Sequence, residues 1–167
     1  KTSLYYESGG QVSDIGTLVS DENIYKIKNT IQMPNGAIGN IIESNQNFNL
    51  GDSVQLLVEQ SFRNGSSKSH TAAHIVHASL RKVLGDTVAQ AGSNVEPGKL
   101  RFDFSYSKKV SEDDLKSIFE LSNSIIFDSA SVSVSTMNIE EAKKQGALAF
   151  FGDKYGDEVR VVDIGDH

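Results

Sequence analysis

The 167-residue sequence is long enough for one large domain or two small ones, and its 38% hydrophobic content can form a packed core. The apolar runs, such as LAFF at 148–151, are too short to cross a membrane, and the sequence contains no cysteine, which excludes disulfides and thiolate ligands. A formal net charge of −6 argues against a broad phosphate-binding surface, although pairs such as Lys108–Lys109 leave short basic spots for nucleic acid. The lack of a targeting segment favours the cytoplasm. Because the sequence begins at Lys1 and stops abruptly at His167, we expect a piece of a longer protein.

Residues 1–62 are rich in Gly, Asn and Ser and contain short alternating apolar runs that are typical of strands. PNG at 34–36 and NLGD at 49–52 are tight-turn signals between such runs, because glycine adopts positive φ without steric cost. The expected strands are TLVS at 17–20, NIYKIKN at 23–29, AIGNII at 37–42 and SVQLLVEQ at 53–60. This pattern predicts a small, mostly antiparallel β-barrel domain over residues 1–62.

The next segment, RNGSSKS at 63–69, is polar, and we predict that it is a flexible domain boundary whose serines cap the helix that follows. Residues 69–85 then have the periodicity of an amphipathic helix. His70, His74 and His77 lie on one side of this helix. The residues predicted to face the core lie next to the histidine side of the helix: Ala72, Val76, Leu80, Val83 and Leu84.

Strand and helix patterns alternate after residue 98. KLRFDFSY at 99–106 predicts a half-buried strand, and Ser111 with Asp114 predicts the start of a helix. SVSVSTM at 131–137 predicts another strand, and a short helix capped by Asn138 and closed by QG at 145–146 precedes a last strand, EVRVVDI, at 158–164. The fold class is therefore α+β, with a two-layer α+β sandwich over residues 63–167 after the small barrel.

The three histidines allow two interpretations. In the first interpretation they border a polar groove and take no part in chemistry, which is common for histidines with this spacing. Alternatively, His70 and His74, four residues apart on one helix, place two imidazoles close enough to share one Zn²⁺. Position 71 is Thr, so the general base of the His-Glu-x-x-His metalloproteases is missing. The candidates for further ligands within the chain are His77, His167, Asp163 and Asp166.

Three segments resemble the editing region of alanyl-tRNA synthetases, in the same order. They are SLYYESGGQVSDIG at 3–16, SHTAAHIVHASLRKVLGDTVAQAGSNVEPGKLRFDFSY at 69–106 and AKKQGALAFFGDKYGDEVRVVDIGD at 142–166. The resemblance implies a small barrel followed by the zinc-bearing α+β domain that these enzymes share with threonyl-tRNA synthetases and free-standing editing proteins. It implies hydrolysis of the ester that joins Ser or Gly to tRNA(Ala), within a cytoplasmic parent enzyme that uses ATP and Mg²⁺ in an upstream domain.

The resemblance also implies roles for particular residues. His70 and His74 match the first two zinc ligands, and Gln90 matches a glutamine that lines the editing pocket. We expect Gln11 and Asp14 to line the same cleft from the barrel side, and Ala73 stands where Thr is common in the family. The remaining ligands belong to a Cys-x-x-x-His motif expected beyond His167, so this chain carries an incomplete zinc site.

Several alternatives remain open at this point. A free-standing deacylase of mischarged tRNA is one, and a non-catalytic tRNA-binding module is another. Zinc either lowers the pKa of a water molecule or orients the amino acid. His77 is expected to face the solvent or a groove wall rather than to relay protons.

Overall fold

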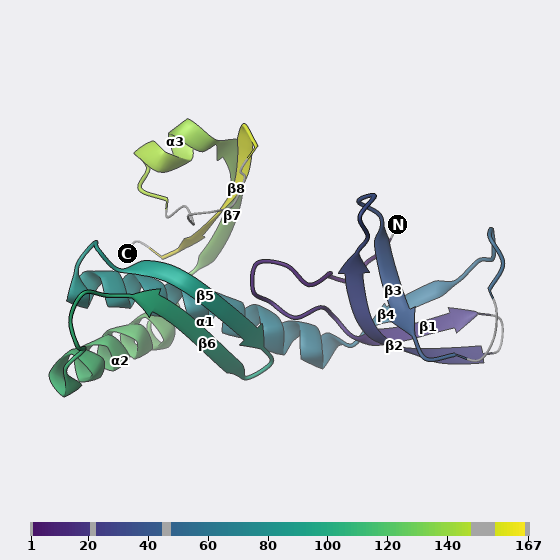
Figure 1. Cartoon of the computed structure of the whole chain (residues 1–167), viewed down its shortest axis with the longest axis horizontal. Helices are drawn as coiled ribbons and strands as arrows, with labels where there is room; N and C mark the ends of the chain where they lie inside the picture. Colours follow the sequence, from purple (N-terminus) through teal and green to yellow (C-terminus); the bar gives the residue numbers. More distant parts are fainter. Residues whose placement is uncertain (1, 21–22, 45–47, 148–155, 166–167) are drawn as a thin grey trace. The chain divides into compact units, whose positions relative to one another are not determined.

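The computed structural model describes residues 2–20, 23–44, 48–147 and 156–165, and within these ranges the chain is α+β, as predicted (Figure 1). The elements in chain order are β1 (Gly16–Ser20), β2 (Asn23–Gln32), β3 (Ile38–Ile42), β4 (Gln55–Val58), α1 (Gln60–Leu84), β5 (Ala89–Glu96), β6 (Lys99–Ser105), α2 (Glu112–Phe127), β7 (Val132–Asn138), α3 (Ile139–Lys144) and β8 (Glu158–Ile164). Among the described residues, no helix is long and apolar enough to span a bilayer.

The chain divides into two compact units that are discontinuous in sequence. The first comprises residues 1–73 and 92–103, and the second comprises residues 74–91 and 104–167. Helix α1 and the β5–β6 hairpin therefore each contribute to both units. The predicted division after residue 62 stays a prediction.

The first unit contains an antiparallel sheet with the order β3-β2-β1-β4 in the described part of the chain. The predicted strands and the PNG turn are confirmed, because Gly36 has φ +82° and Met33 N donates to Ala37 O over 2.7 Å. Within the described residues no ladder joins β3 to β4, so the predicted closure into a barrel is not confirmed. Strands β3 and β4 are the two edges of this sheet in the described part of the chain.

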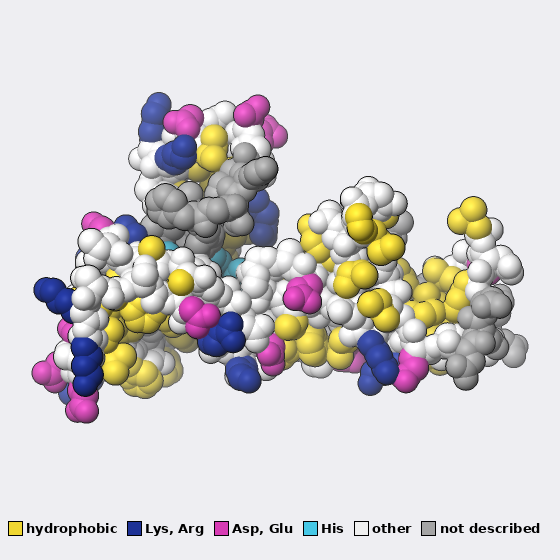
Figure 2. All heavy atoms as spheres, viewed as in Figure 1, with side chains coloured by type: hydrophobic (Ala, Val, Ile, Leu, Met, Phe, Trp, Pro, Cys, Tyr) yellow, Lys and Arg dark blue, Asp and Glu magenta, His cyan; other side chains and the backbone are white. Residues whose placement is uncertain are grey.

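The core of this sheet is formed by Leu4, Leu18 and Ile27, with partly buried side chains packed against them. Among these, Tyr25 and Phe48 meet edge to face with ring centroids 5.2 Å apart. Large hydrophobic side chains also remain exposed in or next to the strands of this sheet: Ile24, Met33, Ile41 and Leu57. Figure 2 shows hydrophobic side chains gathered on the surface of this sheet.

The prediction of a flexible boundary over residues 63–69 is wrong, because these residues belong to helix α1. Two serines of this segment, Ser66 and Ser69, are buried rather than exposed as in a linker. Ser69 is buried, and its Oγ accepts a hydrogen bond from Gly98 N over 3.1 Å. Gly65 lies so close to Pro97 that an added Cβ would be 2.8 Å from the proline Cβ. The missing side chain at position 65 thus allows the β5–β6 turn to approach the helix.

The buried stripe of α1 runs through Ser66, Ser69, Ala73, His77 and Leu80. Leu80 is buried as predicted, whereas the other four residues of the predicted core face are half-buried. His77 is 5% exposed, so the solvent-facing option considered for it is wrong. The spacing of His77 along the helix could not show that this side of α1 is covered.

In the second unit, the structure confirms both predicted helix starts. Ser111 and Asp114 form a reciprocal capping box at α2, and the Asn138 side chain accepts from Glu140 N at α3. Strands β7 and β8 pair antiparallel over their whole length, with Val134 opposite Val162.

Candidate functional site

The glycine motif near the N-terminus folds into a tight turn. Ser8 N donates to Gln11 O over 3.3 Å, and Gln11 N donates to Ser8 O over 3.0 Å. The two central residues, Gly9 and Gly10, have φ values of +58° and +77°, as in a type I′ turn. Because other residues rarely adopt these angles, the turn requires its two glycines.

Strand β5 holds this turn in place within the first unit. Val95 N donates to Gly10 O over 2.8 Å, and Val12 N donates to Val95 O over 3.1 Å. The Cα of Gly10 faces Ser93, whose Oγ occupies the space that a Cβ would need. The backbone on both sides of Gln11 is therefore anchored to β5.

The turn brings Gln11 to the first histidine of α1. Gln11 Oε1 lies 2.8 Å from His70 Nδ1, although the two residues are 59 positions apart. An amide oxygen accepts hydrogen bonds and cannot donate them, so a hydrogen bond here requires the proton on Nδ1, which in a neutral imidazole leaves the lone pair on Nε2. The Gln11 side chain is buried, with 6% of the residue exposed. Both residues belong to the first unit.

His74 follows His70 by one helical turn on α1, which gives the i, i+4 spacing predicted for a metal pair. Within the described ranges, no group of three or more His, Cys, Asp or Glu residues is placed to hold a metal ion. Of the other candidate ligands, Asp163 is an exposed residue of β8, whereas Asp166 and His167 lie outside the described residues.

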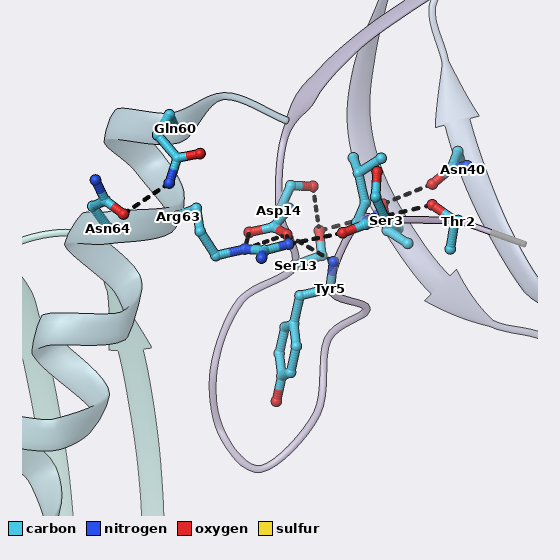
Figure 3. Close-up of polar contacts among 11 residues, drawn as sticks. Thr2, Ser3, Tyr5, Ser13, Asp14, Asn40, Gln60, Arg63 and Asn64 are labelled. Carbon is cyan, nitrogen blue, oxygen red and sulfur yellow. Dashed lines mark hydrogen bonds and ion pairs between the residues drawn. The ribbon is translucent and has the colours of Figure 1, made fainter. Parts of the chain in front are cut away.

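Asp14 is 1% exposed and forms an ion pair with Arg63 of α1 (Figure 3). Arg63 Nε lies 2.9 Å from Oδ1 and 2.7 Å from Oδ2, and Nη2 contacts Oδ2 as well. Tyr5 N donates to the same carboxylate over 2.7 Å, and Arg63 Nη2 donates to Ser3 O over 3.0 Å. The hydrogen bonds to Asp14 raise the pKa of the Arg63 guanidinium. This pair fastens the N-terminal segment to α1.

Sequence reasoning missed Arg63, because it assigned 63–69 to a flexible boundary. No local pattern links Arg63 to Asp14, because the two residues are 49 positions apart and the burial of Asp14 is known only from the structure. The assignment of Asp14 to substrate binding stays a prediction.

Gln90 and Ala73 occupy different elements. Gln90 is a half-buried residue of β5 in the second unit, and its Oε1 is buried without a hydrogen-bond partner among the described residues. Ala73 is a buried α1 residue of the first unit. An unpartnered buried acceptor is costly unless a ligand or water satisfies it.

Burial lowers the pKa of His77, and the positive charge of Arg81, one turn further along α1, lowers it in addition. The unfolded state therefore binds more protons than the folded state below about pH 6.5, the ordinary histidine pKa. His77 contributes stability that is fully present above this value and is lost as the pH falls toward its folded pKa.

We therefore expect that the free energy of unfolding decreases less on acidification in His77→Gln than in the unaltered protein. Urea unfolding in the presence of a chelator, between about pH 7.5 and about pH 5, measures this difference. The slope with pH is the readout, because the substitution also changes packing. Parallel pH curves for the two proteins would contradict the expectation.

Known proteins match this chain over its full length. It is 44% identical to the alanine–tRNA ligase of Clostridioides difficile (strain 630), over 99% of this chain and 19% of the relative. It is 42% identical to the enzyme of Lysinibacillus sphaericus (strain C3-41), over 100% of this chain and 18% of the relative. The Leuconostoc citreum (strain KM20) ligase is 44% identical, over 99% of this chain and 19% of the relative. No family model matches the chain.

The chain belongs to the alanine–tRNA ligase family. It spans about a fifth of the length of the curated relatives that it matches.

Proposed function

We propose that this segment edits mischarged tRNA, by hydrolysing the ester that joins Ser or Gly to tRNA(Ala). The parent enzyme would ligate alanine to the same tRNA with ATP and Mg²⁺ in another domain. The observation that carries the proposal is the contact between Gln11 and His70. It joins the glycine motif and the histidine helix, which are the two segments that most resemble an editing region.

The chemistry of amino acid selection explains why such a segment is needed. A pocket that accepts Ala cannot strongly reject Gly, which is smaller, or Ser, which adds one hydroxyl. A second site that hydrolyses the wrong esters corrects these errors. That site can use the serine hydroxyl as a positive signal, because buried polar groups that bind the hydroxyl stay unpaired when Ala is present.

The described donors fit half of a zinc site. Imidazole nitrogen is a common zinc ligand, and the hydrogen bond to Gln11 leaves Nε2 of His70 as the nitrogen able to bind a metal. His74 adds a second imidazole on the same side of α1. We propose that the remaining ligands are the Cys and His expected beyond His167. Zn²⁺ at such a site supplies Lewis acidity for ester hydrolysis.

Gln90 is proposed to contact the substrate rather than the metal. Its buried Oε1 can accept a hydrogen bond from the serine hydroxyl or from the α-ammonium group, whereas its amide nitrogen can donate to the ester carbonyl. In this role Gln90 holds the amino acid in position. Ala73, which precedes His74 on α1, is also proposed to bind the substrate.

For Gln90→Ala we expect about a tenfold lower rate of Ser-tRNA(Ala) hydrolysis, which corresponds to one lost hydrogen bond. The zinc content should be unchanged, because the residue is proposed to touch substrate alone. Elemental analysis and single-turnover deacylation, measured on the same preparation, check both parts. An equal loss of zinc would show that Gln90 supports the metal site instead.

The proposed function is tested by incubating the protein at its full natural length with Ser-tRNA(Ala), Gly-tRNA(Ala) and Ala-tRNA(Ala). We expect release of serine and glycine, while the alanine ester is spared. Binding of tRNA without hydrolysis of any ester would instead identify a non-catalytic tRNA-binding module. Equal hydrolysis of all three esters would contradict the proposed selectivity.

A further inference from the structure

We infer that Gln11 is a positioning residue, whose side-chain oxygen fixes the tautomer and the orientation of the His70 ring so that Nε2 faces a metal ion. The inference rests on the zinc site of the proposed function. Gln11 Oε1 lies 2.8 Å from His70 Nδ1, and a hydrogen bond between them requires the proton on Nδ1.

Gln11 is held more firmly than an ordinary loop residue. Its own N–H and C=O close the turn with Ser8, and the neighbouring residues on both sides hydrogen-bond to Val95. With 6% of the residue exposed, the side chain is shielded from water that would compete for His70. The backbone anchoring therefore holds the side-chain oxygen of Gln11 in a fixed position next to His70.

The shape of the glycine turn also brings its backbone close to His70. The Cβ that Gly9 lacks would lie 3.9 Å from Cε1 of His70, so the turn backbone approaches the imidazole edge itself. The two positive φ values that glycine permits thus bring Gln11 and the ring edge together. Partners of this kind orient metal-binding histidines, and their removal commonly costs about 10- to 100-fold in metal affinity.

The first test is made on metal-free protein and needs neither zinc nor tRNA. Long-range ¹H–¹⁵N spectra, recorded above the pH where histidine titrates, report which ring nitrogen of His70 carries the proton, and His70→Asn assigns the signals. We expect the Nδ1–H form in the unaltered protein and in Gln11→Glu, which keeps an acceptor. In Gln11→Met, whose thioether sulfur is only a weak acceptor, the Nε2–H form should appear. An unchanged tautomer in Gln11→Met would overturn the inference.

The second test is the affinity of the full natural-length protein for Zn²⁺ alone. We expect about a tenfold loss or more in Gln11→Met and retention in Gln11→Glu. Gln60→Met is the matched control, because Gln60 is exposed and its amide contacts Asn64 over 2.9 Å. A tautomer change without any change in zinc affinity would also overturn the inference.

These outcomes are separable from the fate of the proposed function. If the tautomer and the zinc affinity respond as expected while no mischarged tRNA is hydrolysed, the positioning role stands and the editing proposal fails. If hydrolysis occurs while Gln11→Met leaves the His70 tautomer unchanged, the editing proposal stands and the positioning role fails.

Discussion

Replacing His74 by Ala is expected to reduce Ser-tRNA(Ala) hydrolysis to background in the full natural-length protein. The substitution removes one of two imidazoles from the proposed metal pair, and a three-ligand remainder holds zinc weakly. His74 is half-buried and lies outside the buried stripe of α1, so the fold should tolerate the change. Zinc content, deacylation rate and far-ultraviolet circular dichroism are measured on one preparation.

The control for this prediction is Lys82→Ala, which alters an exposed residue of the same helix. It should leave zinc content and hydrolysis unchanged. Normal hydrolysis in His74→Ala would exclude a metal role for this residue. Loss of zinc without loss of hydrolysis would show that the metal is structural.

Replacing Arg63 by Ala is expected to lower the free energy of unfolding by about 3 kcal/mol, because it leaves the Asp14 carboxylate buried without its cation. The backbone N–H of Tyr5 continues to donate to this carboxylate but supplies no full charge. Adding Asp14→Asn to Arg63→Ala should recover part of the loss, since it removes the uncompensated charge. Urea unfolding of the two single variants and the double variant measures these energies.

Arg101→Ala provides the matched comparison. The Arg101–Asp103 pair has a similar distance of 3.1 Å, but its side chains are 67% and 46% exposed. Exposed pairs contribute about 1 kcal/mol or less, so this substitution should have a small effect. Equal losses for the two arginines would show that burial of Asp14 does not determine the cost.

The sequence predicted the elements whose signals are local. Alternating apolar residues identified the strands of the first unit, and the Ser111–Asp114 and Asn138 caps marked two helix starts. The start of α1 was predicted wrongly, because Ser66 and Ser69 resemble linker residues until their buried contacts are known. The same limit applies to His77, whose burial depends on which side of α1 is covered.

For the candidate site, the sequence predicted individual residues but not the contacts between them. His70 and His74 were found by helical spacing, and Gln11 by its resemblance to a known motif. Their contact could not be derived from spacing, since 59 residues separate Gln11 from His70. The Arg63–Asp14 pair spans 49 residues, and neither partner carries a local pattern that names the other.

Two long-range contacts of the site have a consequence for inheritance. Gln11 and Asp14 precede residue 62, whereas their partners His70 and Arg63 follow it. A gene fragment that begins at residue 63 would encode the histidine helix without the amide that orients its first imidazole, and an arginine without its carboxylate. We therefore expect natural recombination and gene fission to move the glycine motif and the histidine helix together, as one heritable module.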